Sequence, residues 1–105
     1  MTPVEGRWKM GDRVLFAAKG VVQENDIAQL VDRITSSELA EVDEIYIDLN
    51  KVTFFSPYAA SILFRSYSRV LAQGKRLTFL NPNEVTQFLL RLFGADYVFP
   101  VVKGM

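Results

Sequence analysis

The stretch from Glu44 to Leu80 decides the fold, and it reads EIYIDLNKVTFFSPYAASILFRSYSRVLAQGKRLTFL. Its first part is an apolar, β-branched run that leads into Asp48 and suits a central strand. A short loop follows, and Ser56-Pro57 then has the residue types of a helix start. Gly74 is a helix stop, and residues 77–80 form a second β-prone run. The stretch therefore predicts a β-α-β crossover.

The residues before this stretch predict a hairpin and a helix. Residues 7–10 and 13–18 flank Gly11-Asp12, as two strands joined by a tight turn do. Lys19-Gly20 interrupts the second strand pattern. Apolar residues then recur at helical spacing over residues 27–34, and Asn25 or Asp26 can cap that helix.

The residues after it predict another helix and a last strand. Asn81 is expected as the N-cap, with Pro82 in the first helical position and Glu84 bonding back to the cap. Four residues are predicted to form the buried face of this helix: Val85, Phe88, Leu89 and Leu92. Residues 97–102 are β-prone, and Pro100 places them at an edge or a strand end.

The helix that starts at Pro57 has two faces at 100° per residue. Its predicted core face holds Ala59, Ala60, Leu63, Phe64, Tyr67, Val70 and Leu71. Its opposite side holds Tyr58, Ile62, Arg65 and Arg69, and we expect these four side chains to face solvent together. Aromatic and arginine side chains are enriched at interface hot spots, so this stripe is the main candidate for a binding surface.

Composition excludes several function classes. The chain has 105 residues, with 12 basic and 12 acidic side chains, and it contains neither Cys nor His. Residues 1–105 are expected to form a single domain. A net charge of zero disfavours nucleic acid as the main partner. The absence of Cys and His, together with the spacing of the carboxylates, argues against an enzyme, a metal site or a cofactor.

The order of elements and three motifs together resemble the STAS domain family. The motifs are residues 47–49 (IDL), residues 52–55 (VTFF) and residues 77–82 (LTFLNP). The resemblance implies an α/β fold: a mixed β-sheet of about five strands, an initial β-hairpin and helices packed on one face. It also implies a bacterial regulatory module that binds a protein, as anti-sigma-factor antagonists do.

The chain departs from the family at its phosphorylation site. Many STAS domains carry Asp-Ser-Ser/Thr-Gly where Ser56-Pro57-Tyr58-Ala59 stands here, and the first Ser of that motif accepts phosphate from a partner kinase. Pro57 occupies this acceptor position and has no hydroxyl. Ser56 could be a displaced acceptor, but a helix N-cap is the simpler interpretation. Asp48 is interpreted as a residue that bonds local backbone N–H groups.

The leading hypothesis is a non-catalytic STAS module that docks on an anti-sigma factor or serine-kinase-like protein without a serine phosphoswitch. The partner-binding residues predicted for it are Phe55, Ser56, Tyr58, Ile62, Arg65 and Arg69, with the loop 51–55. Two alternatives stay open, namely an accessory STAS subunit of a lipid-transport ATPase complex and a small-ligand sensor with a polar pocket at the strand carboxyl ends. We expect a cytoplasmic protein without membrane insertion, and a homodimer is possible.

Overall fold

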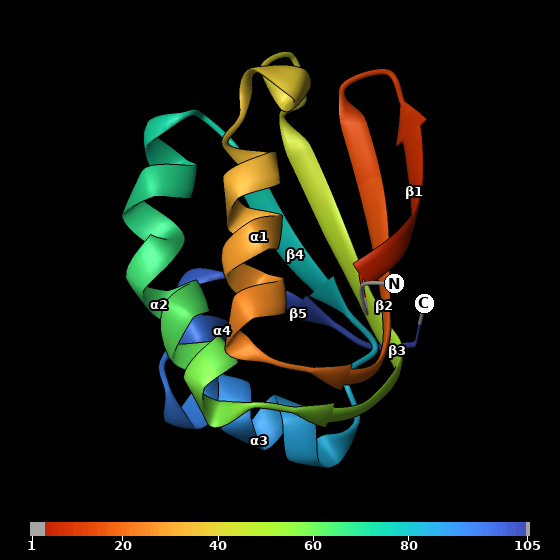
Figure 1. Ribbon diagram of the computed structural model, residues 1–105, viewed down its shortest axis with the longest axis vertical. Helices are drawn as coiled ribbons and strands as arrows, with labels where there is room; N and C mark the ends of the chain where they lie inside the picture. The colour runs from red at the N-terminus through yellow and green to blue at the C-terminus, as the bar shows by residue number, and fades with distance from the viewer. Residues whose placement is uncertain (1–3, 105) are drawn as a thin grey trace.

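The sheet of the protein has the strand order β1-β2-β3-β4-β5. The computed structural model describes residues 4–104, with the side chains of residues 11–104. Strands β1 (Val4–Met10) and β2 (Arg13–Val22) form the predicted antiparallel hairpin. Strands β3 (Glu44–Phe55), β4 (Arg76–Leu80) and β5 (Val101–Val102) follow in parallel, so β3 is central (Figure 1). The predicted mixed α/β sheet is confirmed.

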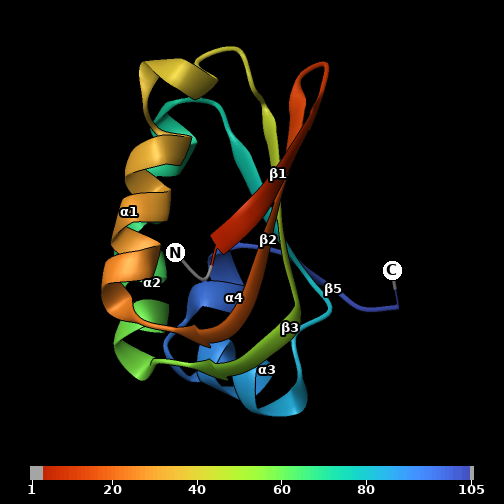
Figure 2. The same cartoon turned by 45° about the vertical axis from the view of Figure 1, so that its right-hand side comes forward.

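The two longest helices cover one face of this sheet. Helices α1 (Glu24–Ile34) and α2 (Pro57–Ala72) lie side by side on that face, and the short 3-10 helix η1 (Ser37–Leu39) follows α1 (Figure 2). Helices α3 (Glu84–Leu92) and α4 (Ala95–Val98) lie at one end of the sheet, close to the start of α2. The β3-α2-β4 unit is the predicted crossover.

The core lies between the sheet and the pair of helices. On α1 the predicted stripe of Ile27, Leu30, Val31 and Ile34 is buried. Alternate residues of β3, among them Ile45, Ile47 and Leu49, point toward the layer of helices and are also buried. Lys75 joins them as a fully buried charged side chain.

The segment expected to be a loop after Asp48 is strand. Strand β3 continues to Phe55 and stays paired with β2, which itself continues through Lys19-Gly20 to Val22. The pairing is kept by two register shifts, between residues 17 and 19 and between residues 20 and 21 of β2. Gly20 has a φ of 69°, which a glycine adopts without strain.

Two helix starts differ from the prediction. Gln23, rather than Asn25 or Asp26, is the N-cap of α1, and its N–H donates to Asp26 Oδ2 at 2.8 Å. Asn83, rather than Asn81, caps α3 and accepts from the N–H of Thr86 at 2.7 Å. Asn81 instead has a φ of 54°, and its Oδ1 accepts from the N–H of Gly104 at 2.9 Å. Because Asn stands on both sides of Pro82, the sequence allows two N-caps for α3. The structure uses the second one, since the chain turns at Asn81 before the helix begins.

Four predicted side-chain positions and the bounds of the last strand are wrong. Leu71 was assigned to the core face of α2 but is half-exposed near the end of that helix. On α3, Val85, Phe88 and Leu92 face outward, whereas Thr86 and Leu90 are buried. In the last segment, α4 takes residues 95–98, and only Val101–Val102 form a strand, which pairs with β4 alone at the edge.

Candidate functional site

The junction between β3 and α2 is built around Ser56. Its Oγ accepts a hydrogen bond from the N–H of Tyr58 at 3.1 Å, and its own N–H donates to the carbonyl of Val22 at 2.9 Å. Pro57 occupies the first helical position. Ser56 is only 9% exposed. The predicted N-cap is confirmed, and the hydroxyl is engaged in the structure.

Phe54 and Phe55 lie on opposite sides of the strand that enters this junction. Phe55 is buried in the core, so it is not the exposed contact that the sequence predicted. Phe54 is about half-exposed instead. Because successive side chains of a strand alternate between its two faces, a strand in place of the expected loop turns Phe54 outward and Phe55 inward.

The first three turns of α2 present part of the predicted stripe. Tyr58 is 71% exposed, and Arg65 is exposed without a hydrogen bond or ion pair to any described residue. Ile62, between them, is partly buried and packs against the core, so the expectation of a fully exposed Ile is wrong. We call Phe54, Tyr58, Ile62 and Arg65 the junction surface.

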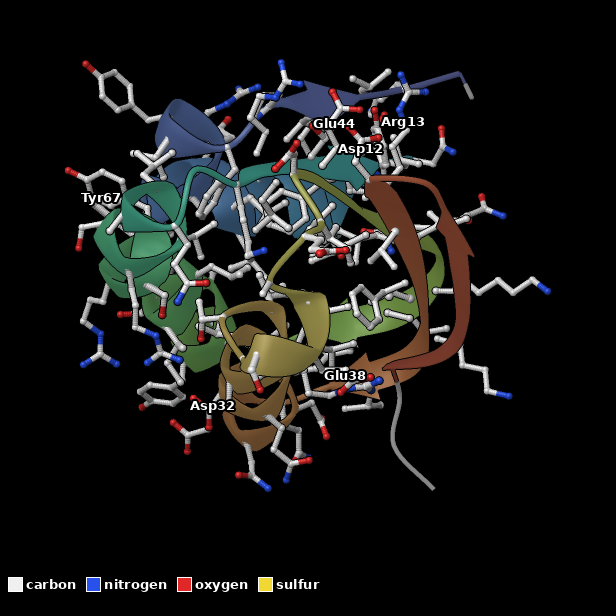
Figure 3. The ribbon with its side chains drawn as sticks, turned by 90° about the horizontal axis from the view of Figure 1, so that it is seen from above. Asp12, Arg13, Asp32, Glu38, Glu44 and Tyr67 are labelled. Carbon is white, nitrogen blue, oxygen red and sulfur yellow. The ribbon has the colours of Figure 1, made fainter. Side chains whose placement is uncertain are left out.

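Arg69, the last member of the predicted stripe, joins two helices. Its Nη2 donates to Asp32 Oδ1 of α1 at 2.7 Å and to Thr35 Oγ1 at 3.1 Å. Figure 3 shows Asp32 on the outer side of α1. The guanidinium of Arg69 therefore already has intramolecular partners, whereas that of Arg65 has none among the described residues.

Asp48 has the local role that was expected of it. Its Oδ1 accepts a hydrogen bond from the N–H of Asn50 at 2.9 Å. The residue lies within β3, at the last position where this strand pairs with β4. A local backbone partner explains the carboxylate without a ligand.

A second exposed apolar group was missed by sequence reasoning. Val85, Phe88 and Leu92 on α3 are 64%, 59% and 62% exposed, and Tyr97 on α4 is 91% exposed. We call these four residues the α3 surface. The sequence showed the amphipathic pattern of α3 but gave no sign that the helix lies at the end of the sheet, where only a narrow strip of it is covered.

A pocket of about 270 Å³ lies at the opposite end of the sheet from α3. Its lining includes Glu44 and Arg76, at the starts of β3 and β4, with Tyr46 and Pro100. Glu44 is bound to Arg13 at 2.8 Å and to Arg76 at 2.6 Å, and Figure 3 shows Glu44, Asp12 and Arg13 together at this end. The pocket is therefore at the amino ends of the strands, whereas the sensor hypothesis places one at the carboxyl ends.

Residues 4–104 contain no cluster of three or more His, Cys, Asp or Glu side chains that could hold a metal ion. None of the helices in this range combines the length and apolarity needed to cross a membrane.

Comparison with solved structures gives the same fold. The unphosphorylated anti-sigma factor antagonist SpoIIAA superposes with a TM-score of 0.76 at 12% identity, over 95% of this chain and 87% of that chain. The phosphorylated form of SpoIIAA, a Bacillus cell fate determinant, gives 0.68 at 16% identity, over 95% and 90%. The NMR structure of the protein TM1081 gives 0.76 at 12% identity, over 92% and 78%.

Sequence comparison identifies the family. None of the curated proteins matches the sequence. The model of the STAS domain family, however, matches residues 10–104, which cover β2 to β5 and the whole crossover. Together with the sheet order and the Ser56 junction, this match shows that the chain belongs to the STAS domain family.

Proposed function

We propose that this STAS protein is a regulatory interaction module that docks on a protein partner through the junction surface. One observation carries the proposal: α2 presents the exposed side chains of Tyr58 and Arg65, and Arg65 has no hydrogen bond or ion pair to any described residue. The half-exposed Phe54 lies in β3, three residues before α2 begins. Tyr58 and Arg65 are seven residues apart, close to two full helical turns. Aromatic and arginine side chains are the types that contribute most to protein interfaces.

The helix start supports binding without a phosphoswitch. SpoIIAA, which shares the fold, has been solved in phosphorylated and unphosphorylated forms and is named an anti-sigma factor antagonist. In this chain Pro57 stands at the position expected for the phosphate acceptor, and the Ser56 hydroxyl accepts from the N–H of Tyr58. We infer that the partner belongs to the anti-sigma-factor or serine-kinase-like class and that the protein behaves as a permanently unphosphorylated antagonist.

The test is an affinity capture from a lysate of the native cell with quantitative mass spectrometry. The parent protein should retain one anti-sigma-factor or kinase-like protein. The double variant Tyr58→Glu/Arg65→Glu should lose it, because the two changes place carboxylates where an apolar contact and a cation are expected. Circular dichroism should show that the variant is folded, since both positions are exposed.

The matched control is Leu71→Glu, a change at a half-exposed position near the other end of α2. This variant should retain the same partner as the parent. A folded double variant that retains the partner at the parental level would contradict the docking surface. Retention of a transport ATPase subunit in place of a kinase-like protein would contradict the partner class and favour the transport alternative.

A further inference from the structure

We propose that the α3 surface binds the α3 surface of a second copy of this chain, with the two helices antiparallel across a twofold axis. The proposal is independent of the junction surface, which lies on other residues. It starts from the three outward-facing apolar residues of α3, at positions i, i+3 and i+7, which form one continuous stripe along the helix. Exposed apolar stripes of this kind are expected at interfaces, because burying them against a partner removes apolar surface from water and is favourable.

The centre of the stripe favours a twofold partner. Helix α3 runs from residue 84 to residue 92, so Phe88 lies at its midpoint. An antiparallel copy whose axis passes beside Phe88 places the two Phe88 rings against each other. The same operation places Val85 of each copy opposite Leu92 of the other. Every exposed apolar side chain of α3 on this stripe then has an apolar counterpart, as isologous interfaces require.

The charges on α3 select the antiparallel orientation. Glu84 is in the first turn and Arg91 in the last, seven residues apart, so both lie on the same flank of the stripe. The twofold operation keeps this flank on one side and reverses its direction, which brings Glu84 of one copy beside Arg91 of the other, twice in the dimer. Arg91 also lies 3.6 Å from Asp96, but its side chain is 68% exposed and can reach across the interface.

A parallel pair would not give this match. Around an axis parallel to the helices, Glu84 of the two copies would lie at the same height on opposite flanks, and no charge would meet its opposite. Antiparallel helices also bring each positive amino end near the negative carboxyl end of the other helix. The surface of one nine-residue helix with Tyr97 beside it is small, so we expect a micromolar rather than a nanomolar dimer.

The first experiment measures self-association by sedimentation velocity from low to several hundred micromolar protein. The parent chain should shift from monomer to dimer over this range. Phe88→Glu should weaken the dimer at least about tenfold, because two carboxylates would meet at the centre of the interface. Leu71→Glu, a half-exposed apolar position outside the α3 surface, should leave the dimer unchanged.

The second experiment tests orientation and does not depend on Phe88. Glu84→Arg and Arg91→Glu should each dimerise more weakly than the parent, since each puts like charges opposite each other. An equimolar mixture of the two variants should form a heterodimer tighter than either homodimer, because both cross-pairs then join an arginine and a carboxylate.

Three outcomes would overturn the proposal. One is a parent chain that stays monomeric at every concentration. If this monomer also binds phosphatidylcholine–phosphatidylglycerol vesicles, the α3 surface is a membrane-binding surface instead. Another is a dimer that Phe88→Glu leaves intact. The third is a mixture no tighter than the single variants, which would exclude the antiparallel register.

Discussion

The ammonium group of Lys75 lies 2.7 Å from the carbonyl oxygen of Val42 and donates a hydrogen bond to it. The same group donates to the carbonyl of Leu39, and the side chain is 1% exposed. The lysine follows α2, whereas its two acceptors lie between α1 and β3. One buried charge thus holds together the two connections that enter β3 and β4.

We expect Lys75→Met to lower the free energy of unfolding by about 3 kcal/mol, because it removes two charge-assisted hydrogen bonds. The carbonyl of Val42 would lose its lysine donor, whereas that of Leu39 would keep the N–H of Val42. Urea unfolding followed by circular dichroism measures this loss. Lys51→Met, at an exposed lysine, is the matched control and should change stability by less than about 0.5 kcal/mol. A Lys75→Met protein as stable as the control would show that the carbonyls find other donors.

The alternation of Phe54 and Phe55 predicts that the same substitution destabilises the protein much more at one position than at the other. Phe55→Ala should cost about 3 to 5 kcal/mol, because it opens a cavity in the core. Phe54→Ala should change the free energy of unfolding by less than about 1 kcal/mol, since that ring is already half in water. Thermal and urea unfolding of the two variants side by side decide the point. Equal losses would mean that the strand assignment at this end of β3 is wrong.

Local signals in the sequence predicted the crossover and its helix start. Ser56, Pro57 and Gly74 act through nearby backbone geometry, so their effect can be read without knowing the tertiary fold. The apolar periodicity of α1 was also sufficient, because that helix lies flat on the sheet and buries its whole apolar stripe.

The position of α3 could not be predicted in the same way. Its apolar residues are periodic, but the buried strip is set by the site at the end of the sheet where the helix packs, and that site depends on contacts distant in sequence. The length of β3 was missed for a related reason: Lys51 and Thr53 make residues 50–55 resemble a loop, whereas pairing with β2 keeps them in the sheet. As a result, the sequence predicted Phe55 as a binding residue, whereas the structure exposes Phe54 and buries Phe55.

The Ser56 cap predicts a graded response to substitution. Ser56→Ala should lower the free energy of unfolding by about 0.5 to 2 kcal/mol, because the N–H of Tyr58 loses its acceptor. Ser56→Asp should retain most of the stability, since a carboxylate accepts the same bond and is favoured at a helix amino end. Urea unfolding measures both variants. If both variants match the parent, the hydroxyl does not stabilise the helix start.

The same hydroxyl should not be phosphorylated. We expect no phosphoserine at position 56 after incubation with ATP and a serine kinase that modifies STAS domains, because Ser56 is nearly buried and its oxygen caps α2. Pro57→Ser restores a hydroxyl at the expected acceptor position and serves as the comparison variant. Mass spectrometry of both proteins gives the answer. Stoichiometric phosphate on Ser56 of the parent would restore a shifted phosphoswitch and contradict the proposed mode of regulation.

At Thr86 we predict a substitution that stabilises the protein. Thr86 lies on the buried face of α3. Its Oγ1 is buried and has no hydrogen-bond partner among the described residues. A buried hydroxyl without a partner costs free energy, and valine has nearly the same shape without the polar atom. Thr86→Val should therefore raise the free energy of unfolding by about 1 kcal/mol, measured by urea unfolding. Thr78→Val, at a partly exposed position on β4, controls for the general effect of the exchange. A loss of stability in Thr86→Val that the control does not share would show that the hydroxyl has a partner in solution, such as a bound water, and that it helps to fix α3 against the sheet.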